Sequence, residues 1–268
     1  MTRDTRFGLA LLGLLVLLAV AGPWLAPDPN LMPDLTGGTL LGPSASHWFG
    51  TDQHSRDVFA RLAHGARVSL GVGVVAVLVA SVLGIVMGLL GGASETIGSR
   101  LVARLIDLGL ALPRVIVLMV LLAGVGVLPL WLFAVILGAT GWAPIARLVR
   151  GEALRLRHTP FVMAAHALGA TPARILAREI FPGTLAPVLV AATLGIADAM
   201  LLEAGLSFFG LGVRPPAPSW GGMLFEARPY LTTAPWLALV PGAALVAATS
   251  AATLLGDALR RVFQPDAT

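Results

Sequence analysis

Long apolar runs alternate with short polar segments along this chain, and their spacing predicts membrane-crossing helices. A helix needs about 20 mostly apolar residues to cross a bilayer, and about six runs approach that length. The third and fourth runs form a close pair, joined at Gly124–Gly126. We therefore expect an all-α polytopic membrane protein. The expected spans are residues 7–26, 68–90, 105–123, 129–148, 185–208 and 235–255.

The positions of the arginines set the expected orientation of these spans. When the N-terminus is placed in the cytoplasm, most arginines fall in inner loops or at inner helix ends, as the positive-inside rule favours. Both termini are then cytoplasmic. The first span has an alternative interpretation as a signal peptide, because the small residues Ala19–Ala21 follow a basic start. The apolar run continues to Ala26, which favours a helix that is retained.

Composition supports the membrane class and restricts the chemistry. Charged residues make up 12% of the chain, against about 25% in soluble domains. The chain has no cysteine, so a disulfide and a thiolate metal site are excluded. All 18 basic residues are arginine. A nucleotide-binding P-loop requires a lysine. We therefore expect no cofactor on this chain, and any ATP must be bound by another subunit.

A polar, arginine-rich segment at residues 149–182 separates the fourth span from the fifth. Gly169 followed by Thr171 and Pro172 predicts one helix that ends at the glycine and a second that starts at a threonine cap. Pro182 is expected to break the chain before the fifth span. Small residues allow close approach of a partner, and larger apolar ones fill its pockets. The expected docking residues are Phe161, Met163, Ala164, Ala165, Leu168, Gly169, Ala170 and Thr171.

The alternative for residues 149–182 is an ordinary basic loop that only holds the topology. The arginines alone fit that alternative. The length of the segment and its cluster of small residues favour docking.

Ionisable residues within spans are costly and are therefore candidates for function. Asp107 and Arg114 are two helical turns apart and should share one face, where we interpret them as helix-end anchors, with a gate as the alternative. Asp198 and Glu203 should point in different directions along the fifth span. With Ser207, they are candidates for the transport path or for contact with a second subunit, and the sequence leaves these two roles open.

Histidine positions argue against an enzyme and against a metal site. None of the five histidines lies in a predicted span, so a serine near Gly205–Ser207 would lack a base at membrane depth. No second ligand stands at suitable spacing from the outer histidines His47 and His54. We expect no catalytic residue and no metal ligand.

Four motifs, in order, resemble one known family. Residues 163–182 resemble the coupling loop of ATP-binding-cassette (ABC) importer permeases, Glu-Ala-Ala-x-x-x-Gly followed by Ile-x-Leu-Pro, from which Met163, Glu179 and Phe181 depart. Residues 49–57 and 65–70 are similar to Phe-Gly-Thr-Asp-x-x-Gly-Arg-Asp and Gly-Ala-Arg-x-Ser-Leu. Ser55 replaces a glycine there, so a different local turn is expected. The other two motifs cover residues 203–221 and 255–260.

Together these motifs resemble the dipeptide, oligopeptide and nickel permeases, in particular the C-type subunit. The resemblance implies the type I ABC importer fold, the bacterial inner membrane and half of a translocation pore. It implies as partners a homologous permease in a heterodimer, two ABC ATPases that use ATP and Mg, and an extracytoplasmic binding protein. Residues 1–66 would form the first helix and an outer loop, and residues 67–268 a five-helix core. The expected outer contacts are Asp52, Arg56, Asp57 and Trp220.

The substrate remains open between peptides and nickel. Peptides are favoured, because no cluster of histidine or methionine suited to a soft or imidazole-bound metal lines the spans. A gradient-driven transporter or a channel is the alternative from another class. Such proteins usually carry several buried carboxylates or inverted repeats.

Overall fold

The computed structural model describes residues 3–26, 28–35, 37–92, 94, 96–126 and 128–263, so residues 1 and 268, the ends of the two expected parts, lie outside it. The described residues are helical, apart from loops and one isolated bridge between Thr51 and Asp57. The helices are α1 (Arg3–Leu25), α2 (Val58–Gly92), α3 (Ile97–Ala111), α4 (Arg114–Val125), α5 (Leu130–Ala139), α6 (Trp142–Arg157), α7 (Pro160–Ala167), α8 (Pro172–Ile175), η1 (Leu176–Ile180), α9 (Phe181–Phe208), α10 (Trp220–Ala227), η2 (Arg228–Tyr230) and α11 (Trp236–Phe263).

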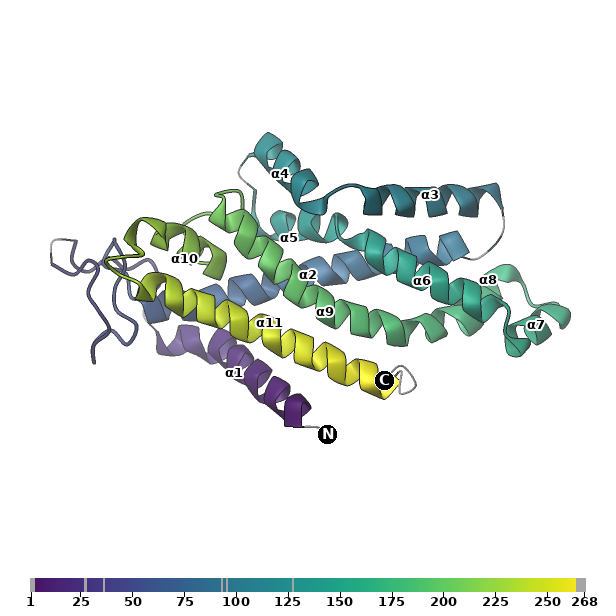
Figure 1. Ribbon diagram of the computed structural model, residues 1–268, viewed down its shortest axis with the longest axis horizontal. Helices are drawn as coiled ribbons and strands as arrows, with labels where there is room; N and C mark the ends of the chain where they lie inside the picture. Colours follow the sequence, from purple (N-terminus) through teal and green to yellow (C-terminus); the bar gives the residue numbers. More distant parts are fainter. Residues whose placement is uncertain are drawn as a thin grey trace.

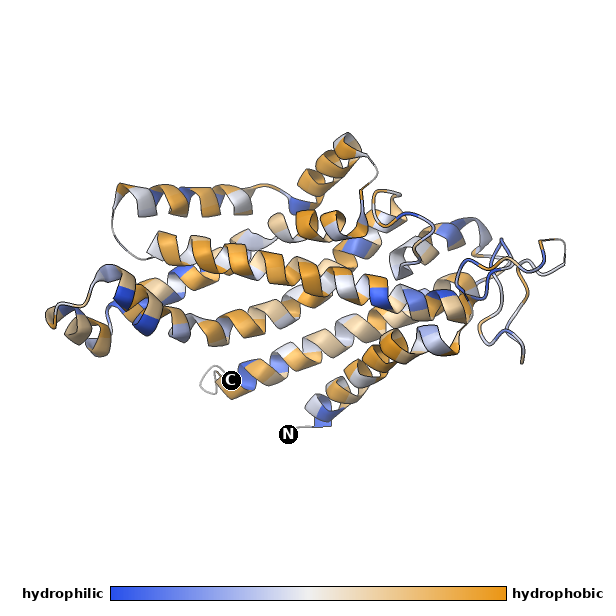
Figure 2. Cartoon of the chain, turned by 180° about the vertical axis from the view of Figure 1, so that it is seen from behind, coloured by the Kyte–Doolittle hydropathy of each residue, from blue (hydrophilic) through white to orange (hydrophobic). Residues whose placement is uncertain are grey.

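Four long helices and two bent helix pairs are apolar enough to cross a membrane. Within the described residues, α1, α2, the continuous run Pro172–Phe208 and α11 qualify alone. The pairs α3–α4 and α5–α6 qualify when each is taken as one span, which gives up to 6 spans. Apolar residues line the helices, and polar ones gather toward the two ends of the bundle (Figure 2). The predicted all-α membrane fold is confirmed.

The ends of the bundle carry different structures. The start of α1, the end of α11 and the short helices α7 and α8 lie toward one end (Figure 1). The loop between α1 and α2 lies at the other end, beside α10. This arrangement agrees with the predicted topology, in which both termini and the arginine-rich segment face the cytoplasm. We call the two ends inner and outer.

The third predicted span is broken. A bend of 84° separates α3 from α4 at Leu112–Pro113. Proline has no backbone N–H and pushes the preceding residue toward extended geometry, which Leu112 adopts at φ −84° and ψ 130°. The prediction that Asp107 and Arg114 share a helix face is therefore wrong, because they lie on opposite sides of the bend.

The fourth predicted span is also bent, by 42° between α5 and α6. The break falls at Thr140–Gly141, where the Thr140 hydroxyl donates to the carbonyl oxygens of Ile136 and Leu137 at 3.2 and 3.0 Å. Side-chain donors that bond to the preceding turn often bend a helix.

The second span starts earlier than predicted, at Val58 instead of Val68. Polar residues such as Arg61 interrupt the apolar run, but Arg61 is buried in ion pairs and does not end the helix. The boundary expected between residues 66 and 67 therefore falls inside α2.

Helix α1 packs against α2 and α11. Pro23 within α1 cannot donate to the carbonyl of Ala19. Arg67 of α2 supplies that donor, with its Nε 2.5 Å from the Ala19 oxygen and its Nη2 2.9 Å from the Val20 oxygen. These contacts hold the outer end of α1, which contains the small residues of the alternative cleavage site, on α2.

Helix α2 lies at the centre of the bundle, and its closest partner is α6. Gly84, Gly88 and Gly92 form a stripe along α2 that faces α6. A Cβ added at Gly88 would lie 2.5 Å from the Cβ of Val149, so only glycine fits there. Small residues at helix interfaces let backbones approach closely in membranes. Helix α6 is therefore held firmly on α2, and it leads directly into α7.

Candidate functional site

The inner end carries the helix–turn–helix that the sequence predicted. Helix α7 ends at Ala167, and Gly169 follows in the left-handed region at φ +82°. The N–H of Ala170 donates to the carbonyl of Ala165 at 3.1 Å, the pattern of a glycine-terminated helix. The Thr171 side chain then caps α8 by accepting from the Arg174 N–H at 3.4 Å. This part of the prediction is confirmed.

Pro182 does not break the chain before the fifth span, so that prediction is wrong. The helix runs on from α8 through η1, one π-helical segment, into α9, with Pro182 in the first turn of α9. A proline clashes with the carbonyl four residues earlier in a regular α-helix. The wider π turn immediately before Pro182 opens the space that the proline ring needs.

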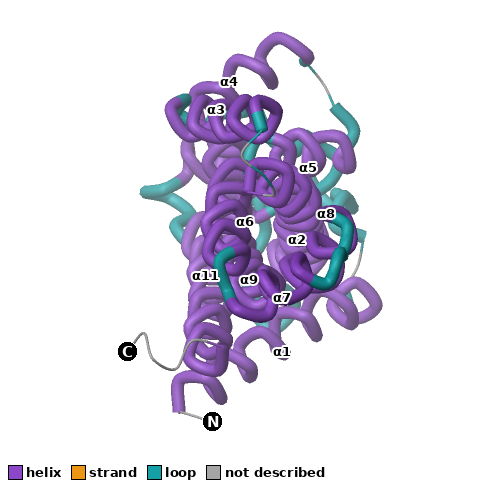
Figure 3. The backbone as a smooth tube through the Cα atoms, turned by 90° about the vertical axis from the view of Figure 1, so that its right-hand side faces the viewer, coloured by secondary structure: helices purple, strands orange, loops and turns teal. Residues whose placement is uncertain are grey.

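One side of the α7–α8 unit packs against α6, and its opposite side is exposed. Val162, Ile175 and Ile180 are buried against Ala153 and Leu156 of α6. Phe161, Met163 and Leu168 point outward with 50%, 61% and 88% of their surface exposed. Figure 3, seen from the inner end, places α7 and α8 at the front of the molecule.

The predicted docking residues divide between these two sides of the α7–α8 unit. Ala165 and Ala170 are partly buried and pack beneath it. The exposed members are Phe161, Met163, Ala164, Leu168, Gly169 and Thr171, which we call the inner surface.

A groove lies behind this surface, between α7 and the start of the α8–η1–α9 helix. Its volume is about 470 Å³. Its walls are mostly apolar, from Val162, Met163, Ile175 and Leu176, with His166 at one side. The inner end thus presents an apolar ridge beside an apolar hollow, a shape suited to a protein partner.

The charged residues of the third and fifth spans meet one another. Arg114 Nη1 donates to Asp198 Oδ2 at 2.7 Å, and Nη2 donates to the Leu137 carbonyl at 2.8 Å. The interpretation of Arg114 as a simple helix-end anchor is wrong, because it joins α9 to both helix breaks. Asp107 pairs instead with Arg147 at 3.4 Å in an exposed position.

A cavity of about 160 Å³ lies beside the Arg114–Asp198 pair. Its walls are contributed by α2, α9 and the α5–α6 break. The lining residues are Ala76, Val77, Ala80, Arg114, Gly141, Pro144, Ile145, Ala191, Gly195, Asp198 and Ala199.

Glu203 and Ser207 face the packed interior in this structure. Glu203 is fully buried, and its carboxylate accepts hydrogen bonds from Ser69 at 3.2 Å and from Ser207 at 2.8 Å. The Ser69 hydroxyl in turn accepts from the N–H of Trp220 at 3.1 Å. These contacts tie α2, α9 and α10 together, so Glu203 and Asp198 have different surroundings on the same helix.

Of the residues expected as outer contacts, three are buried within the chain and Asp57 is half-buried. Trp220 is fully buried, and its indole N–H donates to the Leu62 carbonyl at 3.0 Å. Asp52 and Arg56 are buried and paired at 2.6 Å. Asp57 accepts from the Ala60 N–H at 2.9 Å. Asp52, Arg56 and Trp220 present no outer surface in this structure, because their polar groups hold the outer loop on α2 and α10.

Asp52 and Arg56 belong to a group of ion pairs whose other two members, Arg61 and Glu226, could not be predicted as partners from the sequence. Arg61 of α2 donates to the carboxylate of Glu226 in α10 from Nη1 at 2.6 Å and from Nη2 at 3.0 Å. Its Nη1 also lies 2.9 Å from the carboxylate of Asp52. Burial acts to raise the pKa of Glu226, but the hydrogen bonds and charge of Arg61, with the charge of Arg56, outweigh it and hold the pKa below its usual value. The partners lie 165 positions apart, so no local spacing could reveal them.

Ser55 of the same loop stands where the family motif has a glycine. Its φ is +61°, in the left-handed region that glycine occupies at little cost.

Within the described residues, Asp52, His54 and Glu226 bring potential metal ligands within 4.8 Å of one another. The carboxylates are already bound by Arg56 and Arg61. Two guanidinium groups at this position would repel a metal ion, so the cluster is an ion-pair network.

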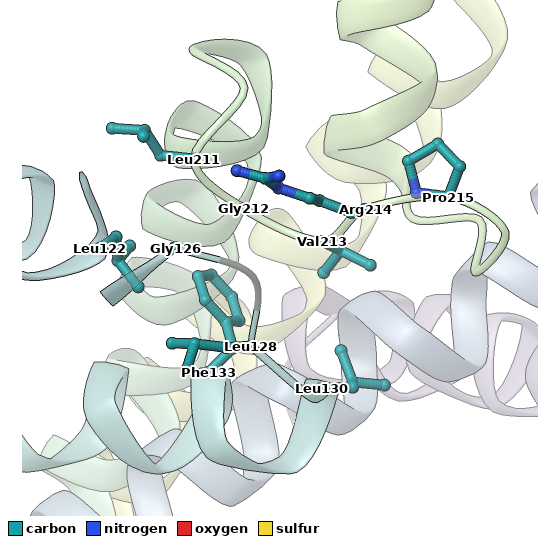
Figure 4. Close-up of a pocket in the computed structure, with 10 residues that line it drawn as sticks. All are labelled: Leu122, Gly126, Leu128, Leu130, Phe133, Leu211, Gly212, Val213, Arg214 and Pro215. Carbon is teal, nitrogen blue, oxygen red and sulfur yellow. The ribbon is translucent and has the colours of Figure 1, made fainter. Parts of the chain in front are cut away.

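A small pocket at the outer side lies where the end of α4 and start of α5 meet the loop after α9. Figure 4 shows Leu122 and Phe133 on one side of it and the segment Leu211–Pro215 on the other. Its volume is about 130 Å³, and Arg214 is the one ionisable residue among those that line it. We assign no ligand to it.

The bent spans, the exposed inner surface and the charges held at membrane depth define a multi-pass transport subunit. The sequence matches the family described as the binding-protein-dependent transport system inner membrane component over residues 80–268. This chain belongs to that family. It is the membrane subunit of an ABC importer and not an enzyme, and it resides in the bacterial inner membrane. The family membership implies ATPase and substrate-binding partners.

Relatives match almost the whole chain. A peptide permease protein of Brucella suis biovar 1 (strain 1330) is 41% identical, over 99% of this chain and 88% of the relative. The dipeptide transport system permease protein DppC of Alkalihalophilus pseudofirmus is 38% identical, over 96% of this chain and 84% of the relative. A peptide transport system permease protein, also from Brucella suis, is 37% identical, over 98% and 88%.

Proposed function

We propose that this chain forms one half of the translocation pore of a peptide importer. A homologous permease supplies the other half, as a heterodimer. Two ABC ATPases bind ATP and Mg beneath the pair, and an extracytoplasmic binding protein delivers the peptide. The names of the relatives, which refer to peptides and dipeptides, support the substrate class.

Nickel is not proposed as the substrate. The relatives reported above are named for peptides, and none of them favours a metal cargo. Among the described residues, the cluster at Asp52, His54 and Glu226 is neutralised by arginines. A gradient-driven transporter or channel is set aside because the family works with ATPases.

The observation that carries the proposal is the exposure of Leu168. An apolar side chain at the end of a short cytoplasmic helix, 88% exposed beside Phe161 and Met163, is costly unless a partner covers it. Its support is rigid, because the opposite side of α7–α8 is packed on α6. A movement of the ATPase would therefore pass through α7 into α6.

Leu168→Glu tests this docking. A carboxylate placed in an apolar contact loses hydration without a partner, so we expect ATPase recovery to fall about tenfold or more. The measurement is co-purification of both ATPases with the tagged permease pair, together with peptide uptake in proteoliposomes. Insertion and pairing of the permeases should be unchanged, because Leu168 has little contact within the chain.

Val262→Glu is the matched control. Val262 is 72% exposed in the last turn of α11 at the same end of the bundle, outside α7. It should leave ATPase recovery at the wild-type level. Equal recovery with Leu168→Glu and Val262→Glu would contradict the proposal. Gly169 is a less suitable test position, because a side chain at φ +82° adds backbone strain to any loss of contact.

A further inference from the structure

The two members of the Arg114–Asp198 pair differ in how firmly the chain holds them. The Arg114 side chain is 26% exposed and donates to the Leu137 carbonyl as well as to Asp198. The Asp198 side chain is 61% exposed. A guanidinium has five N–H donors and a carboxylate accepts about four hydrogen bonds. The pair therefore keeps unused donors and acceptors on its open side.

The depth of Asp198 restricts what covers that open side. Asp198 lies ten residues before the outer end of α9 at Phe208, about 15 Å along the helix. An exposed carboxylate at such a depth is costly in lipid and normally faces a water-filled path or another protein. The adjoining cavity has small walls at Gly141, Ala191 and Gly195, which leave room for a main chain beside the two charges.

We propose that Arg114 and Asp198 form a binding subsite for the charged ends of a short zwitterionic peptide. The peptide ammonium binds Asp198 and the peptide carboxylate binds Arg114, so that the four charges alternate in sign. This inference rests on the proposed function as a peptide importer. The two residues pair with each other when no peptide is present, and neither charge is then left alone at membrane depth.

A ligand with a single charge fits this subsite less well. An ammonium alone would approach Asp198 beside the fixed positive charge of Arg114, and a carboxylate alone would meet Asp198 in the same way. A zwitterion supplies both opposite charges and exchanges one ion pair for two. The subsite therefore favours peptides with both ends free over capped peptides.

The test is a photo-crosslinking cycle on the complete importer in nanodiscs. The probe is radiolabelled alanyl-benzoylphenylalanine, used with a free or an acetylated amino end. A charge-assisted hydrogen bond in a desolvated site corresponds to about a tenfold or greater change in binding. We expect Asp198→Asn to reduce labelling of the permease by the free peptide about tenfold. Acetylation should reduce labelling of the wild-type importer by a similar factor.

The losses of labelling caused by Asp198→Asn and by acetylation of the peptide should not add. If the ammonium binds Asp198, acetylation has almost no further effect on the Asp198→Asn importer, because the interaction is already lost. Asp198→Glu keeps the charge and should retain the preference for the free peptide. Asp107→Asn is the control, since Asp107 is also an acid of a bent span but pairs with Arg147 at an exposed position away from the cavity. It should leave labelling unchanged.

Two results would overturn the peptide subsite and leave the proposed function intact. One is equal labelling by the free peptide in wild type and Asp198→Asn; the other is an effect of acetylation that persists in full in Asp198→Asn. In both cases the wild-type importer would still take up free dipeptide, so the proposed function would stand. Failure of the wild-type importer to take up any labelled dipeptide would overturn the proposed function and the subsite together.

Discussion

Arg61 and Glu226 show how individual residues fasten the outer loop. Each makes more than one ion pair, and together with Asp52 and Arg56 they alternate in sign across α2, α10 and the loop between α1 and α2. Removal of one member from such a network leaves the others buried without full compensation. The loop position therefore depends on all four charges.

Glu226→Gln should destabilise the protein by about 3 kcal/mol at neutral pH, because Arg61 and Arg56 then keep a buried positive charge without its partner. The measurement is the thermal unfolding midpoint of the purified protein in detergent. A midpoint that does not change would show that the Glu226 pairs contribute nothing net to stability.

The same carboxylate makes stability depend on pH. The folded pKa of Glu226 is lower than its unfolded value, so its contribution is fully present above the unfolded pKa and is lost as pH falls through the folded pKa. Wild type should therefore lose more of its thermal stability on acidification through the carboxylate range than Glu226→Gln does. Parallel pH profiles of the two proteins would contradict this assignment.

Among the helices, the α2–α6 contact depends on the glycine stripe. A Cβ at Gly88 would lie 2.5 Å from Val149 and 2.7 Å from the Ala146 carbonyl oxygen, whereas nothing lies within 4 Å of a Cβ at Gly71 in the same helix. Gly88→Ala must move α6 away from α2, at a cost of about 1–3 kcal/mol.

Gly71→Ala is the control for this prediction. It adds the same methyl group to α2 on an exposed side and removes the helix penalty of glycine. In thermal unfolding of the purified protein, Gly88→Ala should melt lower than wild type and Gly71→Ala should melt at or slightly above it. A Gly88→Ala variant as stable as Gly71→Ala would show that α6 is not held by close packing on α2.

Sequence periodicity predicted the presence of these helices better than their limits and breaks. The turn at Gly169–Pro172 was predictable because its signals are local: a glycine after one helix and a threonine cap before the next. The start of α2 was not, because Arg61 is polar in sequence and is neutralised by Asp52 of the preceding loop and by Glu226, which lies 165 positions away. The same limit applies to Arg114, whose partner Asp198 lies 84 positions away.

Across the whole molecule, the helix directions place the two ends of the bundle on opposite sides of the membrane. The chain has no cysteine, so a single introduced cysteine is its only thiol. Val262→Cys should react with a membrane-impermeant maleimide only in inverted vesicles, and Trp48→Cys only in right-side-out vesicles. Both positions are well exposed, at 72% and 66%. Labelling of both cysteines from the same side would contradict the assigned topology.

Helix α6 is a rigid link between the inner surface and the cavity. It runs for 16 residues from the break at Thr140–Gly141 to the start of α7, a length of about 24 Å. A rod of that length pivoted at Gly141 converts a displacement of about 2 Å at α7 into a rotation of about 5° at the cavity wall. Helix α6 therefore connects the inner surface to the cavity wall beside the Arg114–Asp198 pair, so a small displacement of α7 would be felt at that wall.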